Sequence, residues 1–209
     1  IYCCFKKVMK KKILIAPLNW GLGHATRCIP IIKALEENGF EPIIASDGVA
    51  LALLKKEFPK LLSVELPAYN IQYSEKGKNF KWKLALQMPK MMLAIKKEKS
   101  KINRIIENYE IDGVISDNRL GVYSSKIPSV FITHQLNVLS GKTSWLTTKL
   151  HLRYLLKFNS CWVPDVSGVE NLSGKLGHPE KIVEKINYIG PLSRIEKKTL
   201  PIKYDIMVL

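Results

Sequence analysis

An α/β fold with a doubly wound parallel sheet is predicted by three features of the sequence. Short apolar runs of strand length recur along the chain, segments with helical periodicity separate them, and polar or glycine-rich loops follow several of them. The runs are continuously apolar, which is typical of parallel strands that are covered on both faces. Strands that alternate with helices form right-handed βαβ units, and these place helices on both sides of a sheet.

Six short apolar runs are predicted to be the strands of this sheet. They lie at residues 12–16, 42–46, 61–66, 111–116, 128–133 and 160–163. In doubly wound sheets, ligands bind beyond the carboxyl ends of the strands. We therefore expect the functional residues in the loops that follow these runs.

The clearest predicted helix spans residues 25–38. Cys28, Ile32 and Leu35 share one stripe, and Asn38-Gly39 is a typical helix stop. An amphipathic helix of this kind packs its apolar stripe against the sheet.

Two further helices are predicted at residues 48–58 and 89–109. The second is expected to begin at Pro89, because proline is well tolerated in the first turn of a helix. Strand and helix are thus expected to alternate throughout the chain.

The composition is that of a globular protein with a strongly positive charge. Apolar residues make up 46% of the chain and charged residues 24%, which argues against disorder. The 33 Lys and Arg residues exceed the 18 Asp and Glu residues and give a net charge of +15. Long-range electrostatics will attract such a protein to phosphates on nucleotides, nucleic acid or anionic lipid. No nucleic-acid recognition motif is present, so no specific nucleic-acid partner is predicted.

Neither the apolar runs nor the cysteines indicate a membrane span or a metal site. No run approaches the roughly 20 apolar residues that cross a bilayer. The cysteines form no CxxC pair and have no histidine at metal-ligand spacing, so reduced thiols in the cytoplasm are expected. They are Cys3, Cys4, Cys28 and Cys161.

The chain is predicted to hold one domain and a fragment of another, because 209 residues are short for two separate cores. Met9 stands directly before the first strand, so residues 1–8 are expected to be upstream sequence. Residues 9–192 form the predicted domain and residues 193–203 a linker. The apolar run at residues 204–209 is interpreted as the first strand of a second domain, the alternative being an added edge strand of the first sheet.

The segment after the first predicted strand has the properties of a ligand-binding loop. Gly21 and Gly23 precede a helix, and glycines in such a turn let the backbone approach a ligand closely. The helix N-terminus adds free N–H groups and partial positive charge for a phosphate or a developing oxyanion. The spacing fits neither the dinucleotide fingerprint, which needs a third glycine, nor a P-loop, which needs Gly-Lys-Ser/Thr.

His24 stands at the start of this helix, where an imidazole can accept a proton near neutral pH. Arg27, one turn later, is expected to pair with a phosphate or a carboxylate. Polar residues also follow two later strands. A carboxylate there, at Asp117, can act as a base or orient a histidine such as His24 or His134.

Each of these residues has a purely structural alternative. His24 can cap or pack the helix, and His134 can hydrogen-bond the backbone at a strand end. Asp117 can cap a helix that begins near Arg119.

Two segments resemble a known family. The sequence GLGHATR at residues 21–27 resembles the N-terminal glycine-rich loop of family 28 glycosyltransferases, whose best-known members add N-acetylglucosamine to a lipid-linked cell-wall precursor. The sequence THQLNVLSG at residues 133–141 is similar to a segment in which a strand of that family ends at His-Glu-Gln-Asn near the interdomain cleft. Gln135 stands where the family often has Glu, which favours hydrogen bonding to sugar hydroxyls over general-base catalysis there.

The resemblance implies a GT-B fold, with residues 9–192 as the N-terminal, acceptor-side Rossmann-like domain. The run at residues 204–209 would then begin the C-terminal nucleotide-sugar domain. His24 and Asp117 are the predicted catalytic residues. Acceptor or substrate binding is predicted for Asn19, Gly21, Gly23, Arg27, Asn118, His134, Gln135 and Asn137.

The predicted function of the full-length protein is sugar transfer from a nucleotide-sugar donor to an acceptor hydroxyl, with inversion and without a metal or cofactor. The resemblance implies a UDP-linked donor such as UDP-N-acetylglucosamine, and a fragment without the second domain would be inactive. One alternative is a UDP-sugar hydrolase, because some GT-B-like hydrolases also resemble the sequence at Gly21 to Arg27. Another is a non-catalytic acceptor-binding subunit of a split glycosyltransferase.

Two basic amphipathic stretches, at residues 81–104 and 145–158, interleave lysines with apolar side chains. Such stretches can contact anionic lipid. A lipid-linked acceptor would favour contact between these stretches and a membrane. A peripheral position on the inner face of the cytoplasmic membrane is therefore predicted. The alternative is that the apolar stripes pack on the sheet and the lysines are simply solvated.

Overall fold

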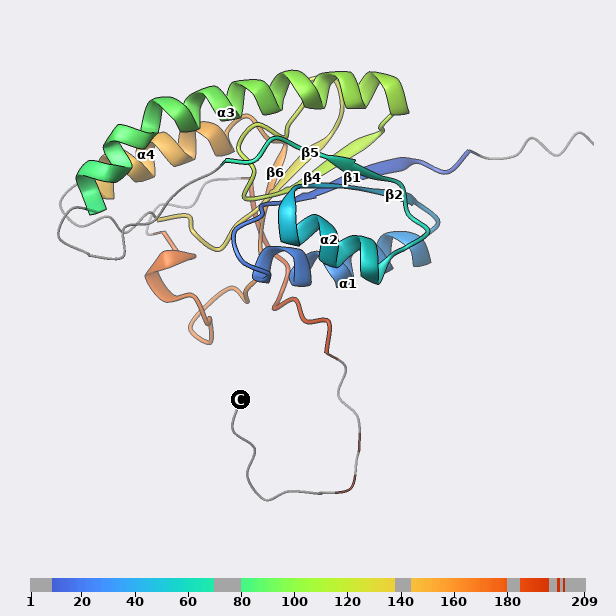
Figure 1. Ribbon diagram of the computed structural model, residues 1–209. Coiled ribbons are helices and arrows are strands. Elements are labelled where there is room, and N and C mark those ends of the chain that lie inside the picture. Colours follow the sequence, from blue (N-terminus) through green and yellow to red (C-terminus); the bar gives the residue numbers. More distant parts are fainter. Residues whose placement is uncertain are drawn as a thin grey trace, which may run out of the picture.

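The computed structural model describes residues 9–69, 80–137, 144–179, 185–195, 199 and 201, with side chains for all of these except 80–88, 144–147, 149 and 150. Within these residues, seven parallel strands form one sheet in the order β3-β2-β1-β4-β5-β6-β7 (Figure 1). The strands are Lys12–Pro17 (β1), Glu41–Ser46 (β2), Ser63–Glu65 (β3), Gly113–Asp117 (β4), Ser129–Ile132 (β5), Ser160–Val163 (β6) and Ile186–Tyr188 (β7). The doubly wound fold and all six predicted strands are confirmed, and β7 is an addition.

The strand order changes direction beside β1. The chain proceeds from β1 outward to β2 and β3, then returns so that β4 pairs with the other edge of β1. In this register Pro17, the last residue of β1, lies opposite Asp117, the last residue of β4. The loops after these two strands therefore diverge from one point, which is where doubly wound sheets bind ligands.

The helices are Gly23–Glu37 (α1), Gly48–Glu57 (α2), Phe80–Tyr109 (α3) and Ser144–Leu155 (α4), with a short 3-10 helix (η3) at Gly174–Leu176. The predicted end of α1 is confirmed. Gly39 has a φ of 79°, and its N–H bonds the Glu36 carbonyl. The Phe40 N–H bonds the Leu35 carbonyl, which completes a Schellman motif.

The predicted start of the third helix was wrong. Pro89 lies inside α3, which begins at Phe80. Proline removes one backbone hydrogen bond of the helix, and Pro89 itself is exposed.

The expected alternation of strand and helix also fails between β4 and β5. Residues 118–128 form a loop, so no helix begins near Arg119. The helix-capping alternative for Asp117 is therefore wrong.

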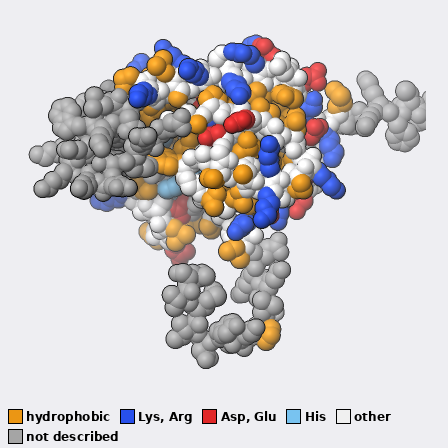
Figure 2. All heavy atoms as spheres, viewed as in Figure 1, with side chains coloured by type: hydrophobic (Ala, Val, Ile, Leu, Met, Phe, Trp, Pro, Cys, Tyr) orange, Lys and Arg blue, Asp and Glu red, His pale blue; other side chains and the backbone are white. Residues whose placement is uncertain are grey.

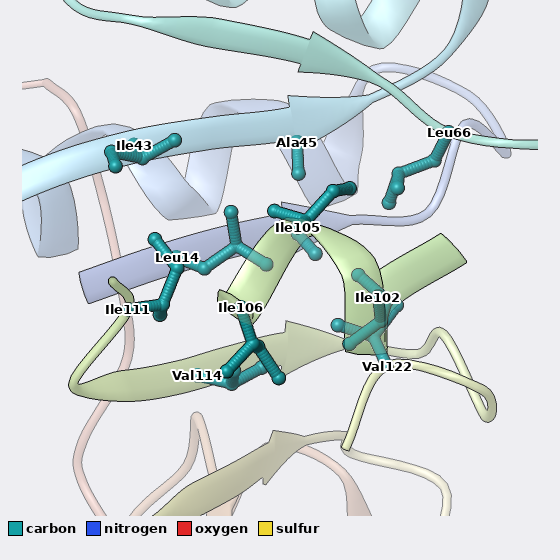
Figure 3. Close-up of a cluster of buried hydrophobic side chains, with 11 residues drawn as sticks. Leu14, Ile43, Ala45, Leu66, Ile102, Ile105, Ile106, Ile111, Val114 and Val122 are labelled. Atoms are coloured by element: carbon teal, nitrogen blue, oxygen red, sulfur yellow. The ribbon is translucent and has the colours of Figure 1, made fainter. Parts of the chain in front are cut away.

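Helices cover both faces of the sheet, with α3 and α4 on one side and α1 and α2 on the other (Figure 1). Successive residues of β1 face opposite layers, as its pleat requires. Leu14 packs with Ile102 and Ile105 of α3, as Figure 3 shows, whereas Ile15 packs with Ile29 of α1 and Leu54 of α2. The two-sided burial that the continuous apolar runs predicted is thus observed.

Part of the predicted domain organisation lies outside the described residues. These parts are residues 1–8, most of the predicted linker after residue 195, and the predicted strand at 204–209. Among the described residues, no helix is long and apolar enough to cross a membrane. Cys28 and Cys161 are buried free thiols.

Candidate active site

His24 and Asp117 meet at the point where the strand order reverses. His24 lies in the first turn of α1, directly after the glycine-containing loop, and Asp117 ends β4. His24 Nδ1 is 2.9 Å from Asp117 Oδ1. The His24 side chain is 13% exposed, and the Asp117 side chain is fully buried. The fold thus buries a carboxylate against a partly accessible imidazole.

Arg27 binds the same carboxylate from the next turn of α1. Its Nε donates to Asp117 Oδ2 at 2.5 Å, and its Nη2 donates to Asp117 Oδ1. Burial by itself would lower the pKa of Arg27, but the hydrogen bond and charge of Asp117 outweigh it and raise that pKa. The two-point contact holds the carboxylate in one orientation.

His24 Nδ1 lies between a hydrogen-bond acceptor and a hydrogen-bond donor. Its Nδ1 lies near Asp117 Oδ1, which can only accept, and also 2.7 Å from Arg27 Nη2, which can only donate. Arg27 Nη2 carries two N–H groups and also donates to Asp117. With the proton on Nδ1 and shared with Asp117, Nε2 is the nitrogen with a lone pair that can accept a proton, and the function proposed below uses this tautomer.

His134 joins this group from the segment after β5. Arg27 Nη1 is 3.2 Å from His134 Nδ1, and because a guanidinium only donates, this nitrogen accepts. Burial lowers the pKa of His134, and the positive charge of Arg27 lowers it further. His134 is thus neutral near pH 7, as the donated hydrogen bond requires.

A cleft of about 540 Å³ opens beside Arg27 and His134. One wall carries polar groups of α1 and of the segment that follows β5. The other wall is formed by the segments that follow β6 and β7 and includes several leucines and prolines. The lining residues are Gly23, Thr26, Arg27, His134, Pro164, Asp165, Leu172, Ser173, Leu176, Pro191 and Leu192. All of them follow the carboxyl ends of strands, as predicted for the ligand site.

Asp165 organises the second wall of the cleft. Its carboxylate accepts hydrogen bonds from the backbone of Val166, Leu172 and Ser173. The Ser173 hydroxyl and His178 Nε2 also contact it, the latter at 3.2 Å. Burial raises the pKa of Asp165, but the hydrogen bonds outweigh it and lower that pKa well below its usual range. A single ionised carboxylate thus fixes this loop.

Asn19 and Asn118 do not line the cleft. Asn19 Nδ2 donates to Asp47 Oδ2 at 3.1 Å, and its Oδ1 accepts from the Ala50 N–H. Asn118 has a left-handed φ of 59°, and its N–H bonds the Ile132 carbonyl. Gly21 has a φ of 73°, which explains the need for glycine in this turn.

Gln135 and Asn137 also stand apart from the lining residues. The Gln135 side chain is exposed, and Asn137 Nδ2 donates to the Lys175 carbonyl. The binding roles predicted for these residues stay predictions.

Sequence reasoning missed Asp165 and Arg119. Asp165 follows the predicted strand at 160–163 just as Asp117 follows its own, so the same strand-end rule would have found it. Arg119 carries no such signal, because an arginine in a loop gives no hint that it is fully buried.

Within the described part of the chain, no group of three His, Cys, Asp or Glu side chains is placed to hold a metal ion. The predicted use of a nucleotide-sugar substrate without a cofactor stays a prediction.

The sequence matches no protein-family model and no curated protein. Several solved structures share the fold. UGT2 from Phytolacca americana, solved with UDP-2-fluoroglucose and pterostilbene, matches 88% of this chain and 55% of its own at a TM-score of 0.56 and 13% identity. MurG from Acinetobacter baumannii matches 90% of this chain and 47% of its own, at a TM-score of 0.52 and 10% identity.

A putative UDP-N-acetylglucosamine 2-epimerase from Listeria monocytogenes matches 75% of this chain and 40% of its own, at a TM-score of 0.52 and 13% identity. Likeness at this level shows the fold and does not fix the reaction. The chain spans about half the length of these proteins or less. It has the Rossmann-like domain fold of the GT-B glycosyltransferases, to which UGT2 and MurG belong.

Proposed function

We propose that the chain is the acceptor-side part of a glycosyltransferase that moves a sugar from a nucleotide-sugar donor to an acceptor hydroxyl, with inversion and without a metal. The observation that carries this proposal is the 2.9 Å contact between His24 Nδ1 and Asp117 Oδ1. The pair lies at the reversal of strand order, and Arg27 links it to the cleft. An imidazole oriented by a buried carboxylate is a standard general base.

In the proposed reaction, His24 Nε2 takes the proton of the acceptor hydroxyl. The acceptor oxygen then bonds to the anomeric carbon, and the bond from that carbon to the nucleotide diphosphate breaks. Attack opposite the leaving group inverts the anomeric configuration. Asp117 stabilises the imidazolium that forms, and Arg27 keeps this carboxylate in place.

The donor is proposed to be UDP-linked, with UDP-N-acetylglucosamine as the first candidate because of the resemblance at residues 21–27. The structure of UGT2 contains a UDP-sugar analogue, which supports a donor of this class. The donor is proposed to bind mainly to a second domain. Residues 9–195 alone would then be inactive.

The test is to incubate the full-length protein with UDP-sugars, with and without candidate acceptors, and to follow products by NMR. Acceptor-dependent transfer with inversion at the anomeric carbon, unchanged by EDTA, supports the proposal. Stoichiometric sugar release without an acceptor would instead identify a hydrolase, in which water takes the place of the acceptor.

We also propose that the face formed by α3 and α4 contacts an anionic membrane from the cytoplasmic side. The helices touch where the Tyr154 hydroxyl lies 3.1 Å from Met92 Sδ. Leu93 of α3 and Leu156, directly after α4, are 59% and 58% exposed. Lys90 is exposed on α3, and Figure 2 shows basic side chains gathered over that helix. Exposed leucines among lysines suit an anionic lipid surface.

Vesicle co-sedimentation tests this surface. Binding to phosphatidylglycerol vesicles, but not to phosphatidylcholine vesicles, is expected. The double substitution Leu93→Ser and Leu156→Ser should weaken it several-fold. Equal binding of the wild-type protein to both vesicle types, or unchanged binding of the double variant, would contradict the proposed surface.

A further inference from the structure

Arg119 is a fully buried charge at the centre of a polar cluster behind the candidate site. Its Nε donates to Glu98 Oε1 and its Nη1 to Asp47 Oδ1, each at 2.6 Å. Its Nη2 donates to the Pro67 carbonyl at 2.7 Å. Glu98 also accepts the Gly121 N–H and the Tyr69 hydroxyl. This guanidinium therefore ties together α3 and the ends of β2, β3 and β4.

One branch of the cluster leads to the loop that precedes His24. Asp47 uses its second oxygen to accept from Asn19 Nδ2, and Asn19 Oδ1 accepts from the Ala50 N–H. Gly48 has a φ of 51°, and a Cβ at this position would overlap the Asn19 amide. The start of α2 is thus shaped to receive Asn19, which stands between β1 and the glycines before His24.

The other branch leads to Asp117. Arg119 follows it by two residues, and the Arg119 carbonyl accepts from Ser116 Oγ at 2.7 Å. Asn118, between them, has a φ of 59°, so the chain turns sharply after the carboxylate. Arg119 Nη1 also lies 3.4 Å from the carbonyl of Pro17, the residue paired with Asp117 in the sheet. The Arg119 side chain therefore reaches the loop before His24 through Asp47 and Asn19, and it contacts the end of β1 beside Asp117 at the Pro17 carbonyl.

A buried ion cluster is a costly way to stabilise a core, because apolar side chains of similar volume serve as well or better. It does impose fixed directions, since each hydrogen bond constrains two groups. Glu98 and Arg119 are fully buried, so their bonds are not screened by water. Such directional constraint is of most use where two catalytic groups must be aligned.

We propose that Arg119, acting through Asp47 and Asn19, is a positioning residue that sets the orientation of His24 relative to Asp117. This inference rests on the proposed function for its catalytic meaning. It also reassigns Asn19 from substrate binding to positioning.

A charge swap in the full-length protein tests this role. Asn19→Asp places a second carboxylate against Asp47 and should break the link. Adding Asp47→Asn restores a donor and an acceptor in the same places, because the new amide can donate to residue 19 and still accept from Arg119. Tyr69→Phe is the control, since it removes a hydrogen bond from the same cluster without touching the loop.

The first readout is the Nδ1–H signal of His24 and its imidazole nitrogen shifts by NMR, which need no substrate. We expect Asn19→Asp to shift or broaden these signals and to lower kcat at least tenfold with KM within about twofold. The double variant should recover most of the wild-type His24 signals and most of kcat. Tyr69→Phe should leave the His24 signals unchanged.

Two outcomes would overturn the positioning role. One is a normal His24 signal in folded Asn19→Asp. The other is a double variant no better than the single one, which would point to direct substrate contact by Asn19. If His24 itself proves dispensable for turnover, the proposed function fails while the NMR result still decides the positioning role.

Discussion

His24 Nδ1 and Asp117 Oδ1 lie 2.9 Å apart although 93 residues separate them in the sequence. The parallel pairing of β1 with β4 brings them together, since it aligns Pro17 with Asp117. The contact gives a partly accessible histidine a buried, negatively charged partner.

Asp117→Asn should lower kcat of the full-length protein by roughly 10²-fold to 10⁴-fold. The amide cannot stabilise an imidazolium and leaves Arg27 without its counter-ion. Steady-state kinetics measure the effect, with circular dichroism to verify folding. Asp112→Asn, at an exposed position directly before β4, is the matched control, and its kcat should be close to that of wild type. Equal activity of both variants would contradict the role of Asp117.

Arg27→Met should raise the pKa of His134 toward its ordinary value. Burial is the larger cause of the lowered pKa, but the Arg27 charge adds to it and would be removed. An NMR titration of the His134 ring measures the change. Arg153→Met, on the exposed surface of α4, serves as the control. An unchanged or lower pKa in Arg27→Met would show that the two groups do not interact.

Acidification should destabilise the protein through His151. Burial lowers the pKa of His151 to about 4, and its Nε2 has no hydrogen-bond partner among the described residues. The unfolded chain binds this proton near pH 6.5, so the folded state binds fewer protons at intermediate pH. Stability is therefore lost as the pH falls from 7 to 4, by about 3 kcal/mol.

Denaturant titrations at several pH values test this dependence. His151→Leu should flatten the loss of stability between pH 7 and pH 4. His178→Leu, at a histidine that is paired with Asp165, should not flatten it in the same way. A His151→Leu profile as steep as that of wild type would rule out this histidine as the cause.

Gly39→Ala should destabilise the protein by about 1 kcal/mol, because alanine is strained in the left-handed region. Gly39 has a φ of 79°, and an added Cβ would meet nothing within 4 Å, so the cost is conformational. Denaturant unfolding measures it. Lys33→Ala, on the exposed side of the same helix, should change stability by no more than about 0.5 kcal/mol. An unchanged free energy of unfolding in Gly39→Ala would contradict the left-handed cap at the end of α1.

The central strands and the loops that form the candidate site could be predicted from the sequence because their signals are local. Continuous apolar runs mark β1 and β4, and a glycine pair before a helix marks the loop at Gly21 and Gly23. The strand β7, Ile186–Tyr188, escaped prediction because Asn187 interrupts it, so it forms no continuous apolar run.

The supporting residues could not be predicted, since their roles depend on distant partners. Arg119 contacts Glu98 and Asp47, which lie 21 and 72 residues away. Asn19 sits in a loop of ligand-binding character, yet its amide is held by α2. Pro89 was misplaced because proline suits a first turn but is also tolerated at an exposed interior position.

The most direct test of the central claim is the turnover of His24→Gln in the full-length protein, measured with a UDP-sugar and an acceptor that the wild-type protein uses. Glutamine can hydrogen-bond Asp117 but cannot accept a proton near pH 7. His178→Gln, at the histidine paired with Asp165, is the control and should stay within about threefold of wild type. We predict that His24→Gln loses at least 10²-fold in kcat with folding unchanged. Turnover of His24→Gln close to wild type would contradict the assignment of His24 as the base.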